Sequence, residues 1–330
     1  MGKYEKAFKA FLDRERNIVD KKLSEALENR KPQSLYEPGY YIIESGGKRL
    51  RPLLVLLSVK AVGGKLNKAY NAAAAVELLH NFTLVHDDIM DNADIRRNIP
   101  TIHKKYDVST AILAGDSLIS VAYEYLLKDC NGIAKKVLAA FTKSLIEVCE
   151  GQSLDKEYEL KEAVSIEEYI LMIEKKTAAL IEMCCITGAI IGGGEEKEIK
   201  CLAKFGKNIG IAFQIQDDLL DIVGNEDDFG KFVGGDLIEG KKTFLFLKAL
   251  EMSGGKDKEK LLAVIKNKGI KPELIQSYKE LYQRLNILKE AENEIQHYTN
   301  LALKSIKKLK NEKYRDFLAL LADSLIKRKK

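Results

Sequence analysis

The segment Ala69–Asp91, with the sequence AYNAAAAVELLHNFTLVHDDIMD, decides the fold of this chain. Its alanine and leucine residues recur with the 3.6-residue period of a buried helix. The segment ends in Asp87, Asp88 and Asp91, and the i, i+4 spacing places Asp87 and Asp91 on one helical face. We therefore expect a buried helix that carries three carboxylates at its C-terminal end.

The rest of the chain is also predicted to be helical. Only five prolines occur in 330 residues, and no run of alternating β-branched residues competes with helix. The further helices that we expect are Tyr4–Arg30, Leu53–Val62, Thr110–Lys128, Ile133–Gln152, Ile166–Ile191, Lys197–Val223, Thr243–Met252, Lys258–Lys266, Pro272–Gln296 and Thr299–Lys327. Because we find no linker or low-complexity segment, we expect an all-α protein, a large helical bundle that forms a single domain over residues 1–330.

Composition excludes several classes of function. The 54 Lys and Arg residues and the 49 Asp and Glu residues give a net charge of +5, and the basic residues are spread along the chain. Such a distribution is unlike a nucleic-acid-binding patch. Five cysteines form no spaced framework, the N-terminus has no secretory signal, and the longest uncharged stretch, Met183–Gly194, is too short to span a bilayer. We expect a cytoplasmic protein with no transmembrane segment and no nucleic-acid partner.

The aspartate pattern recurs in FQIQDDLLD, residues 213–221. Asp217 and Asp221 share a helical face, Asp218 lies alongside, and Gln214 lies three residues before Asp217. Taken alone, one such motif is equally well explained as an acidic helix end in solvent. Two copies, each on a helix with the pattern of a buried helix, are hard to attribute to chance. Facing each other across the bundle, they would line a central cavity and hold Mg²⁺ through hard oxygen ligands.

Positive groups that suit an anionic ligand lie near both clusters. Those that follow the aspartates are Arg96, Arg97, Lys231, Lys241 and Lys242. Upstream, GGKRLRP (46–52) places three cations beside a glycine pair and ahead of a helix N-terminus. The backbone amides and guanidinium groups of such a segment are suited to binding a phosphate group. Taken alone, that segment is equally well a solvated basic loop. His80 lies two turns before Asp87, so we expect it to contact substrate rather than to be a satisfied core histidine.

Together these segments resemble the trans-isoprenyl diphosphate synthases, which include farnesyl and geranylgeranyl diphosphate synthases. The matching pieces, in the order of the family, are GGKRLRP (46–52), LLHNFTLVHDDIMD (78–91), RRNIPTIH (96–103), KT (176–177), FQIQDDLLD (213–221) and GKFVGGDLIEGKKT (230–243). One departure is Asn98, where the family usually has glycine; this affects loop flexibility more than chemistry. The resemblance implies the isoprenoid synthase type of helical bundle and a homodimer.

The resemblance also implies a role for each site residue. Those implied to bind about three Mg²⁺ ions directly are Asp87, Asp91 and Asp217, and those implied to ligate the ions or orient bound water are Asp88, Asp218 and Asp221. The implied ligands of isopentenyl diphosphate are Lys48, Arg51, His80 and Arg97. The implied ligands of the allylic diphosphate are Arg96, Lys176, Lys231 and Lys241. The side chains implied to face the developing carbocation are Thr177 and Gln214.

The implied activity is a Mg²⁺-dependent, head-to-tail condensation of isopentenyl diphosphate with dimethylallyl, geranyl or farnesyl diphosphate, a prenyltransferase step of isoprenoid and lipid biosynthesis. The growing tail would run back along the helix toward Phe82, and one helical turn of about 5.4 Å is comparable to one isoprene unit. In the family that the sequence resembles, a lone aromatic five residues before the first aspartate is typical of short-chain enzymes. Bulky Phe82 beside small Thr83 therefore implies geranylgeranyl diphosphate as product, with farnesyl diphosphate as the close alternative.

Two other functions stay open. A terpene cyclase also ionises prenyl diphosphates in a helical bundle, but it needs no basic loop for a second diphosphate and carries a different second metal motif. A non-catalytic subunit of a heteromeric prenyl synthase tends to lose aspartates or the basic loop, and this sequence retains both.

Overall fold

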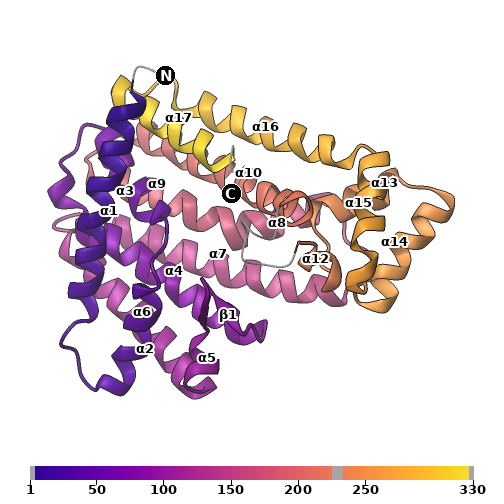
Figure 1. Cartoon of the computed structure of the whole chain (residues 1–330). Helices are drawn as coiled ribbons and strands as arrows, with labels where there is room; N and C mark the ends of the chain where they lie inside the picture. The colour runs from indigo at the N-terminus through magenta and orange to yellow at the C-terminus, as the bar shows by residue number, and fades with distance from the viewer. Residues whose placement is uncertain (1–3, 225–232, 327–330) are drawn as a thin grey trace. The chain divides into compact units, whose positions relative to one another are not determined.

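The computed structural model describes residues 4–224 and 233–326, and nearly all of their regular structure is helical (Figure 1). In this part of the chain, the only strands are β1 (Ile95–Arg96) and β2 (Ile99–Pro100), which pair antiparallel. The predicted all-α class is confirmed. Two compact units are present. The first draws its described residues from Met1–Phe141, Cys184–Leu202 and Lys308–Leu320, and the second from Thr142–Met183, Ala203–Lys307 and Leu321–Lys330.

The first unit is organised around α4 (Tyr70–Met90). Its other elements are α1 (Glu5–Leu27), α2 (Gln33–Glu44), α3 (Leu50–Ala61), η1 (Leu66–Lys68), α5 (Ile102–Lys105) and α6 (Val108–Lys128). Helix α4 packs chiefly against α6, and also against α1 and α3. The four alanines 72–75 are completely buried, because their small side chains let neighbouring helices approach closely. Helix α4 is therefore the buried helix that the sequence predicts.

The N-terminal end of α4 is capped by Asp129, the residue that follows α6. One carboxylate oxygen accepts the backbone N–H of Ala72 at 2.8 Å, and the other accepts the side-chain amide of Asn71 at 2.8 Å. A carboxylate here satisfies a helix donor that lacks an intrahelical partner and complements the positive end of the helix dipole. The cap fixes α4 along its axis against α6, and so places the aspartates of its last turn.

After α4, the chain turns back through the β1–β2 hairpin. Arg96 pairs with Ile99, so Arg97 and Asn98 form a two-residue turn, with φ angles of +52° and +63°. Positive φ at both residues is the signature of a type I′ hairpin turn. Asparagine adopts this conformation almost as readily as glycine, which explains why Asn98 can replace the usual glycine. Arg97 is the unusual residue, because left-handed backbone at a non-glycine residue gathers at functional sites.

The second unit contains shorter helices together with parts of longer ones. Its elements are α8 (Ile166–Ile173), the π-helical turn η2 (Glu174–Ala178), α12 (Gly235–Ile238), α13 (Phe244–Met252), α14 (Gly255–Asn267), η3 (Pro272–Leu274), α15 (Ile275–Arg284) and α16 (Ile287–Ile306). The helices that contribute residues to both units are α7 (Ala134–Leu160), α9 (Ala179–Ile191), α10 (Glu196–Val223) and α17 (Glu312–Ile326). A capping box between Ser165 and Glu168 starts α8 and thus places the η2 turn that follows it.

The helix prediction is wrong at several places, among them α7, which runs to Leu160 rather than ending at Gln152. Helix α2 forms where none is predicted, because its packing against α1 and α6 outweighs the cost of buried Pro38 inside it. The predicted helix Ile166–Ile191 is interrupted by η2. The C-terminal helices separate at Asn286, which has a φ of +59°, and again between Ile306 and Glu312, rather than near residue 298.

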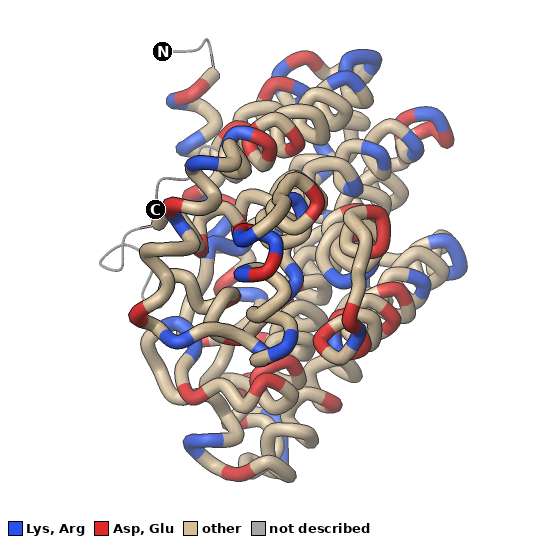
Figure 2. Tube along the Cα trace, turned by 90° about the vertical axis from the view of Figure 1, so that its right-hand side faces the viewer, with Lys and Arg blue, Asp and Glu red and all other residues tan. Residues whose placement is uncertain are grey.

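Two global predictions concern charge and membranes. Lys and Arg segments are interspersed with Asp and Glu segments along the trace (Figure 2), in agreement with the spread of basic residues along the sequence. None of the helices in the described residues combines the length and the apolar character needed to cross a bilayer.

Candidate active site

The first aspartate cluster lies in the last turn of α4. Asp88 is only 2% exposed, and both of its carboxylate oxygens accept hydrogen bonds from Nε of Arg96, at 2.7 and 2.9 Å. Nη2 of Arg96 forms a further ion pair with Asp88 at 2.7 Å. Asp87 is half-buried and Asp91 is exposed. The middle carboxylate is thus engaged by the hairpin, whereas the outer two have more contact with solvent.

The second cluster repeats this arrangement near the end of α10. Oδ2 of buried Asp218 accepts the Tyr169 hydroxyl at 2.6 Å and the Phe244 backbone N–H at 3.1 Å, and Oδ1 accepts Nε2 of Gln214 at 3.1 Å. Burial and the neighbouring Asp236 carboxylate raise the pKa of Asp218 to about 7, although the three hydrogen bonds oppose this rise. Again, the middle aspartate of the motif is held by the surrounding fold.

The outer aspartates are the candidates for binding a metal. Asp87 and Asp91 lie one turn apart in the first cluster, as do Asp217 and Asp221 in the second. Within residues 4–224 and 233–326, no group of three or more His, Cys, Asp or Glu side chains is gathered closely enough to hold an ion alone. Mg²⁺ accepts few protein carboxylates and completes its coordination with water and substrate phosphates. Two carboxylates one helical turn apart therefore fit Mg²⁺ as ligands.

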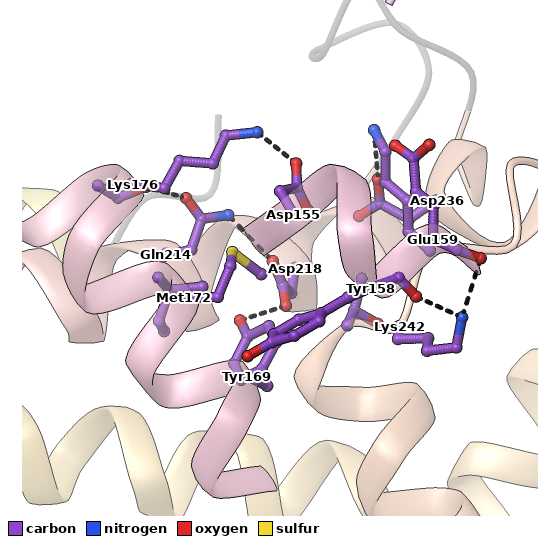
Figure 3. Close-up of a pocket in the computed structure, with 14 residues that line it drawn as sticks. Asp155, Tyr158, Glu159, Tyr169, Met172, Lys176, Gln214, Asp218, Asp236 and Lys242 are labelled. Carbon is purple, nitrogen blue, oxygen red and sulfur yellow. Dashed lines mark hydrogen bonds and ion pairs between the residues drawn. The ribbon is translucent and has the colours of Figure 1, made fainter. Parts of the chain in front are cut away.

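A cavity of about 130 Å³ lies in the second unit beside the second cluster (Figure 3). Five residues with roles implied by the resemblance line it: Lys176, Thr177, Gln214, Asp218 and Lys241. They come from η2, from α10 and from the segment that follows α12. The fold thus brings together residues that are up to 65 positions apart in the sequence.

The π-helical turn η2 presents Lys176 and Thr177 to this cavity. Two glycines allow α7 and α10 to close on that turn. A Cβ on Gly151 would lie 2.6 Å from Cα of Lys176, and a Cβ on Gly210 would lie 2.6 Å from Cα of Ala178. Both distances are far inside van der Waals contact. A π-helical turn is rare and frequently marks a functional site, and here the glycines fix its place.

A chain of hydrogen bonds orients the polar groups of the cavity. Oγ1 of Thr177 donates to Oε1 of Gln214 at 2.8 Å, and Nε2 of Gln214 donates to Asp218. Because the hydroxyl proton of Thr177 is used in this bond, the oxygen keeps its lone pairs for a cationic ligand. Lys176 is paired with Asp155 of α7 (Figure 3). The cavity therefore holds an oriented oxygen beside a lysine.

The adjacent residues Lys241 and Lys242 have different surroundings. Nζ of Lys242 donates to the backbone carbonyl of Tyr158 at 2.7 Å, near the end of α7, and burial lowers the pKa of this lysine. Nζ of Lys241 forms an ion pair with Glu239 at 2.7 Å and lies 3.7 Å from a carboxylate oxygen of Asp236. Lys242 therefore caps a helix, whereas Lys241 is paired with acidic side chains, which an anionic ligand can replace. Lys231, the third cation predicted here, lies outside the described residues.

In the first unit, Arg49 anchors the basic loop that precedes α3. Its side chain is only 4% exposed. The guanidinium donates to Asp20 at 2.7 Å, to Glu77 at 3.0 Å and to the carbonyl of Ile43 at 2.8 Å. Lys48, the neighbouring residue, is exposed. Arg49 thus holds the loop to the core, while Lys48 projects at its surface.

Three of the predicted ligands of isopentenyl diphosphate gather around this loop. Nη1 of Arg51 lies 3.1 Å from Nε2 of His80, and Arg97 donates to the carbonyl of Gly46 and to Ser45. Burial and the nearby arginines, Arg51 foremost, lower the pKa of His80 well below 6.5. The imidazole is therefore neutral, and Nε2 accepts from the guanidinium. Its Nδ1 is buried and makes no hydrogen bond to a described residue, which leaves a donor for a ligand.

Phe82 and Thr83, predicted to set product length, are half-buried on α4. The hydroxyl of Thr83 donates to the backbone carbonyl of His80 at 2.8 Å, so it bonds to its own helix. Leu78 and Leu79, one turn earlier, are buried at 0% and 1% exposure. Phe82 therefore lies at the edge of a closed core.

Sequence reasoning missed Asp155, Tyr169 and Asp236. Tyr169 gives one signal that could have found it, because a tyrosine on the apolar face of α8 needs a hydroxyl partner, which is Asp218. Asp155 and Asp236 give no local signal, since acidic residues are common on solvated helical faces. Only the fold brings Asp155 to Lys176 and Asp236 toward Asp218.

Comparisons with known proteins agree with the fold and with the motifs. The polyprenyl synthetase family model matches residues 32–284. The short chain isoprenyl diphosphate synthase of Methanothermobacter thermautotrophicus is 40% identical over 312 residues, which cover 94% of this chain and 95% of that protein. The geranylgeranyl diphosphate synthase of Sulfolobus acidocaldarius is 40% identical over 302 residues, which cover 90% of this chain and 91% of that protein.

The crystal structure of geranylgeranyl pyrophosphate synthetase from Pyrococcus horikoshii superimposes with a TM-score of 0.88 at 38% identity. The superposition covers 99% of this chain and 100% of that chain. This chain belongs to the polyprenyl synthetase family.

Proposed function

We propose that this protein is a prenyltransferase that joins isopentenyl diphosphate to an allylic diphosphate head to tail and releases diphosphate. The cavity of the second unit carries the proposal, because it gathers three lysines and an oriented Thr177–Gln214 pair beside an aspartate cluster. The family match, residues 32–284, includes this cavity and the basic loop and takes in parts of both units. We therefore propose that both units act as one catalytic domain.

Mg²⁺ is the proposed cofactor, with about three ions per site. The side chains proposed to hold it are Asp87, Asp91, Asp217 and Asp221. When bound, Mg²⁺ supplies positive charge that stabilises a departing diphosphate. Asp88 and Asp218 have a supporting part. Arg96 donates to both oxygens of Asp88, and Tyr169 and Gln214 donate to one oxygen each of Asp218, so these carboxylates keep the cluster and the cavity in shape.

Two groups of cations are proposed to hold the two substrates. Those proposed for isopentenyl diphosphate are Lys48, Arg51, His80 and Arg97, and those for the allylic diphosphate are Arg96, Lys176, Lys231 and Lys241. Guanidinium groups grip phosphate oxygens through paired hydrogen bonds, and the proton on Nδ1 of His80 adds a neutral donor. The proposed allylic substrates are dimethylallyl, geranyl and farnesyl diphosphate.

The proposed chemistry needs no protein nucleophile. The allylic C–O bond breaks, which leaves negative charge on diphosphate and positive charge on the allyl group. Lys176 and Lys241 stabilise the diphosphate at the cavity, and the oxygen of Thr177, oriented by Gln214, faces the cation. The alkene of isopentenyl diphosphate donates its electron pair to form the new C–C bond, and the proton then lost passes to the released diphosphate.

Geranylgeranyl diphosphate is the proposed product, with farnesyl diphosphate as the close alternative. Phe82 is the proposed floor for the growing tail, and the closed core at Leu78 and Leu79 supports this assignment. If the floor is correct, Phe82→Ala lengthens the products. Unchanged products from the active variant would refute it.

We also propose that the protein works as a homodimer in the cytoplasm. Helix α6 exposes Val108, Ile112 and Leu113 at 50%, 42% and 57%, a set of large apolar residues suited to a subunit interface. None of the five cysteines, all of which lie in the described part of the chain, forms a disulfide, as expected in a reducing compartment. Sedimentation equilibrium of the purified protein tests the dimer.

The proposed reaction is tested with purified protein, Mg²⁺, labelled isopentenyl diphosphate and each allylic diphosphate in turn. Products are treated with phosphatase, extracted and sized by chromatography. We expect prenyl alcohols longer than the primer, and no elongation in the presence of EDTA. A cyclic hydrocarbon made from an allylic diphosphate alone would indicate a terpene cyclase instead. An inactive protein that elongates only with a second subunit would indicate a heteromeric enzyme.

A further inference from the structure

The imidazole of His86 rests on α6 in the first unit. Its Nε2 lies 3.4 Å from the backbone carbonyl of Ile112 and 3.8 Å from a carboxylate oxygen of Asp116. Between these two contacts lies Gly115, and a Cβ built there would lie 2.5 Å from Cδ2 of His86 and closer still to Nε2. Residues 112, 115 and 116 share one face of a helix. That face forms a seat into which the ring fits only because residue 115 has no side chain.

The same imidazole supports Phe82. The two rings lie one helical turn apart on α4, with their centroids 4.7 Å apart and their planes inclined by 58°. This is the spacing of an attractive aromatic pair. The side chain of His86 is 27% exposed, so its contacts with α6, rather than burial in the core, hold the ring in place.

We infer that Gly115 and His86 determine product length by setting where the ring of Phe82 lies. The inference rests on the proposed function, in which Phe82 is the floor of the tail site. Gly115 fixes the position of the His86 ring, this ring fixes the position of the Phe82 ring, and Phe82 closes the end of the tail site. Gly115 and His86 are thus positioning residues, and neither needs to touch the reacting atoms.

The role of Gly115 follows from its lack of a Cβ. Carbon atoms in contact lie about 3.5–4.0 Å apart, so an alanine methyl at this position cannot coexist with the seated ring. In Gly115→Ala, the imidazole must leave α6, and Phe82 loses its partner. In His86→Ala, the partner is removed outright and the seat stays empty. Both substitutions release Phe82 from the same contact.

Product analysis of both variants tests the inference. From isopentenyl diphosphate and farnesyl diphosphate, we expect the ratio of longer products to the wild-type product to rise about three- to tenfold in each variant, the effect of losing one aromatic pair. The double variant should match His86→Ala, because the alanine methyl then fills vacated space. The glycine control is Gly254→Ala, whose Cβ would meet no atom within 4 Å, and we expect unchanged products from it.

Two outcomes overturn the inference. One is unchanged or shorter products from active Gly115→Ala and His86→Ala variants. The other is additive lengthening in the double variant. Failure of the wild-type protein to elongate at all would instead overturn the proposed function.

A second measurement is independent of turnover. The ring-current shift that Phe82 imposes on the carbon-bound imidazole protons of His86, measured by NMR, should disappear in Phe82→Ala and in Gly115→Ala, and should persist in Gly254→Ala. A His86 signal that is unaffected by Gly115→Ala would contradict the seat directly.

Discussion

Arg96 binds both carboxylate oxygens of Asp88, through Nε at 2.7 and 2.9 Å. A side chain at the turn of the hairpin is thereby tied to the last turn of α4, and the middle aspartate of the motif has no oxygen left without a partner. The neighbouring residue, Arg97, donates in the opposite direction to the basic loop at Gly46. The Arg96–Arg97 hairpin therefore links the first aspartate cluster to the proposed diphosphate loop.

Breaking the Asp88–Arg96 pair should cost both stability and activity. Asp88→Ala leaves a part-buried guanidinium without its carboxylate, so we expect the free energy of unfolding to fall by about 2 kcal/mol. We also expect KM for isopentenyl diphosphate to rise, because the hairpin that carries Arg97 loosens. Urea unfolding and steady-state kinetics measure the two effects. In Asp88→Asn, one acceptor oxygen remains, and both losses should be smaller. A variant as stable and active as the wild type would show that the pair is dispensable.

The hairpin turn itself should accept glycine and reject a β-branched residue. Asn98 has a φ of +63°, so Asn98→Gly should change the free energy of unfolding by less than about 0.5 kcal/mol. Asn98→Val should lose about 1–2 kcal/mol, because a left-handed backbone crowds its Cβ. Thermal unfolding of the two variants checks the difference. Equal stability of the two would mean that the turn is not left-handed in solution.

Gly151→Ala should disable the cavity by moving the η2 turn. The new Cβ would lie 2.6 Å from Cα of Lys176, so either α7 or η2 must shift. A displacement of about 1 Å in a positioning group costs about 100-fold in rate, and we expect kcat to fall by that order. Gly254→Ala, in open space, serves as the control. An active Gly151→Ala enzyme would show that the close approach has no part in placing Lys176.

Thr177→Val should reduce kcat more than it changes KM for the allylic diphosphate. Valine keeps the shape of threonine but cannot donate to Gln214, so the amide loses its orientation and the cavity loses an oxygen. A lost hydrogen bond of about 1.4 kcal/mol corresponds to about a tenfold fall in kcat. Thr177→Ser keeps the hydroxyl and should recover most of the rate. Equal rates for Val and Ser would exclude a role for the hydroxyl.

His80 should make the fold less stable in mild acid. Its pKa in the folded protein is well below 6.5, so on acidification the unfolded chain takes up a proton that the folded protein does not. The contribution of His80 is therefore complete above pH 6.5 and is lost as the pH falls toward the folded-state pKa, by up to about 1.4 kcal/mol per pH unit. His80→Gln can still accept from Arg51 and does not titrate. Urea unfolding at pH 5.5 and 7.5 should show a smaller acid loss in this variant, and equal losses would contradict a neutral His80.

Much of this molecule follows from local patterns in its sequence. The apolar period of residues 69–91 predicts α4, and the i, i+4 spacing predicts which aspartates share a face, because both are properties of one helix. The order of six motifs indicates the family, and five predicted residues do line one cavity. The roles of the predicted site residues stay predictions.

Only the tertiary structure decides how residues of the same type differ in burial and in hydrogen bonding. Asp87 and Asp88 are adjacent and identical in type, yet only Asp88 is buried against Arg96. Lys241 and Lys242 both line the cavity, yet only Lys242 donates to the backbone carbonyl of Tyr158 near the end of α7. Sequence fixes the chemistry of a side chain and its place on a helix, but burial and hydrogen bonding depend on residues far along the chain. For the same reason, the seat of His86 on Gly115 cannot be read from either helix alone.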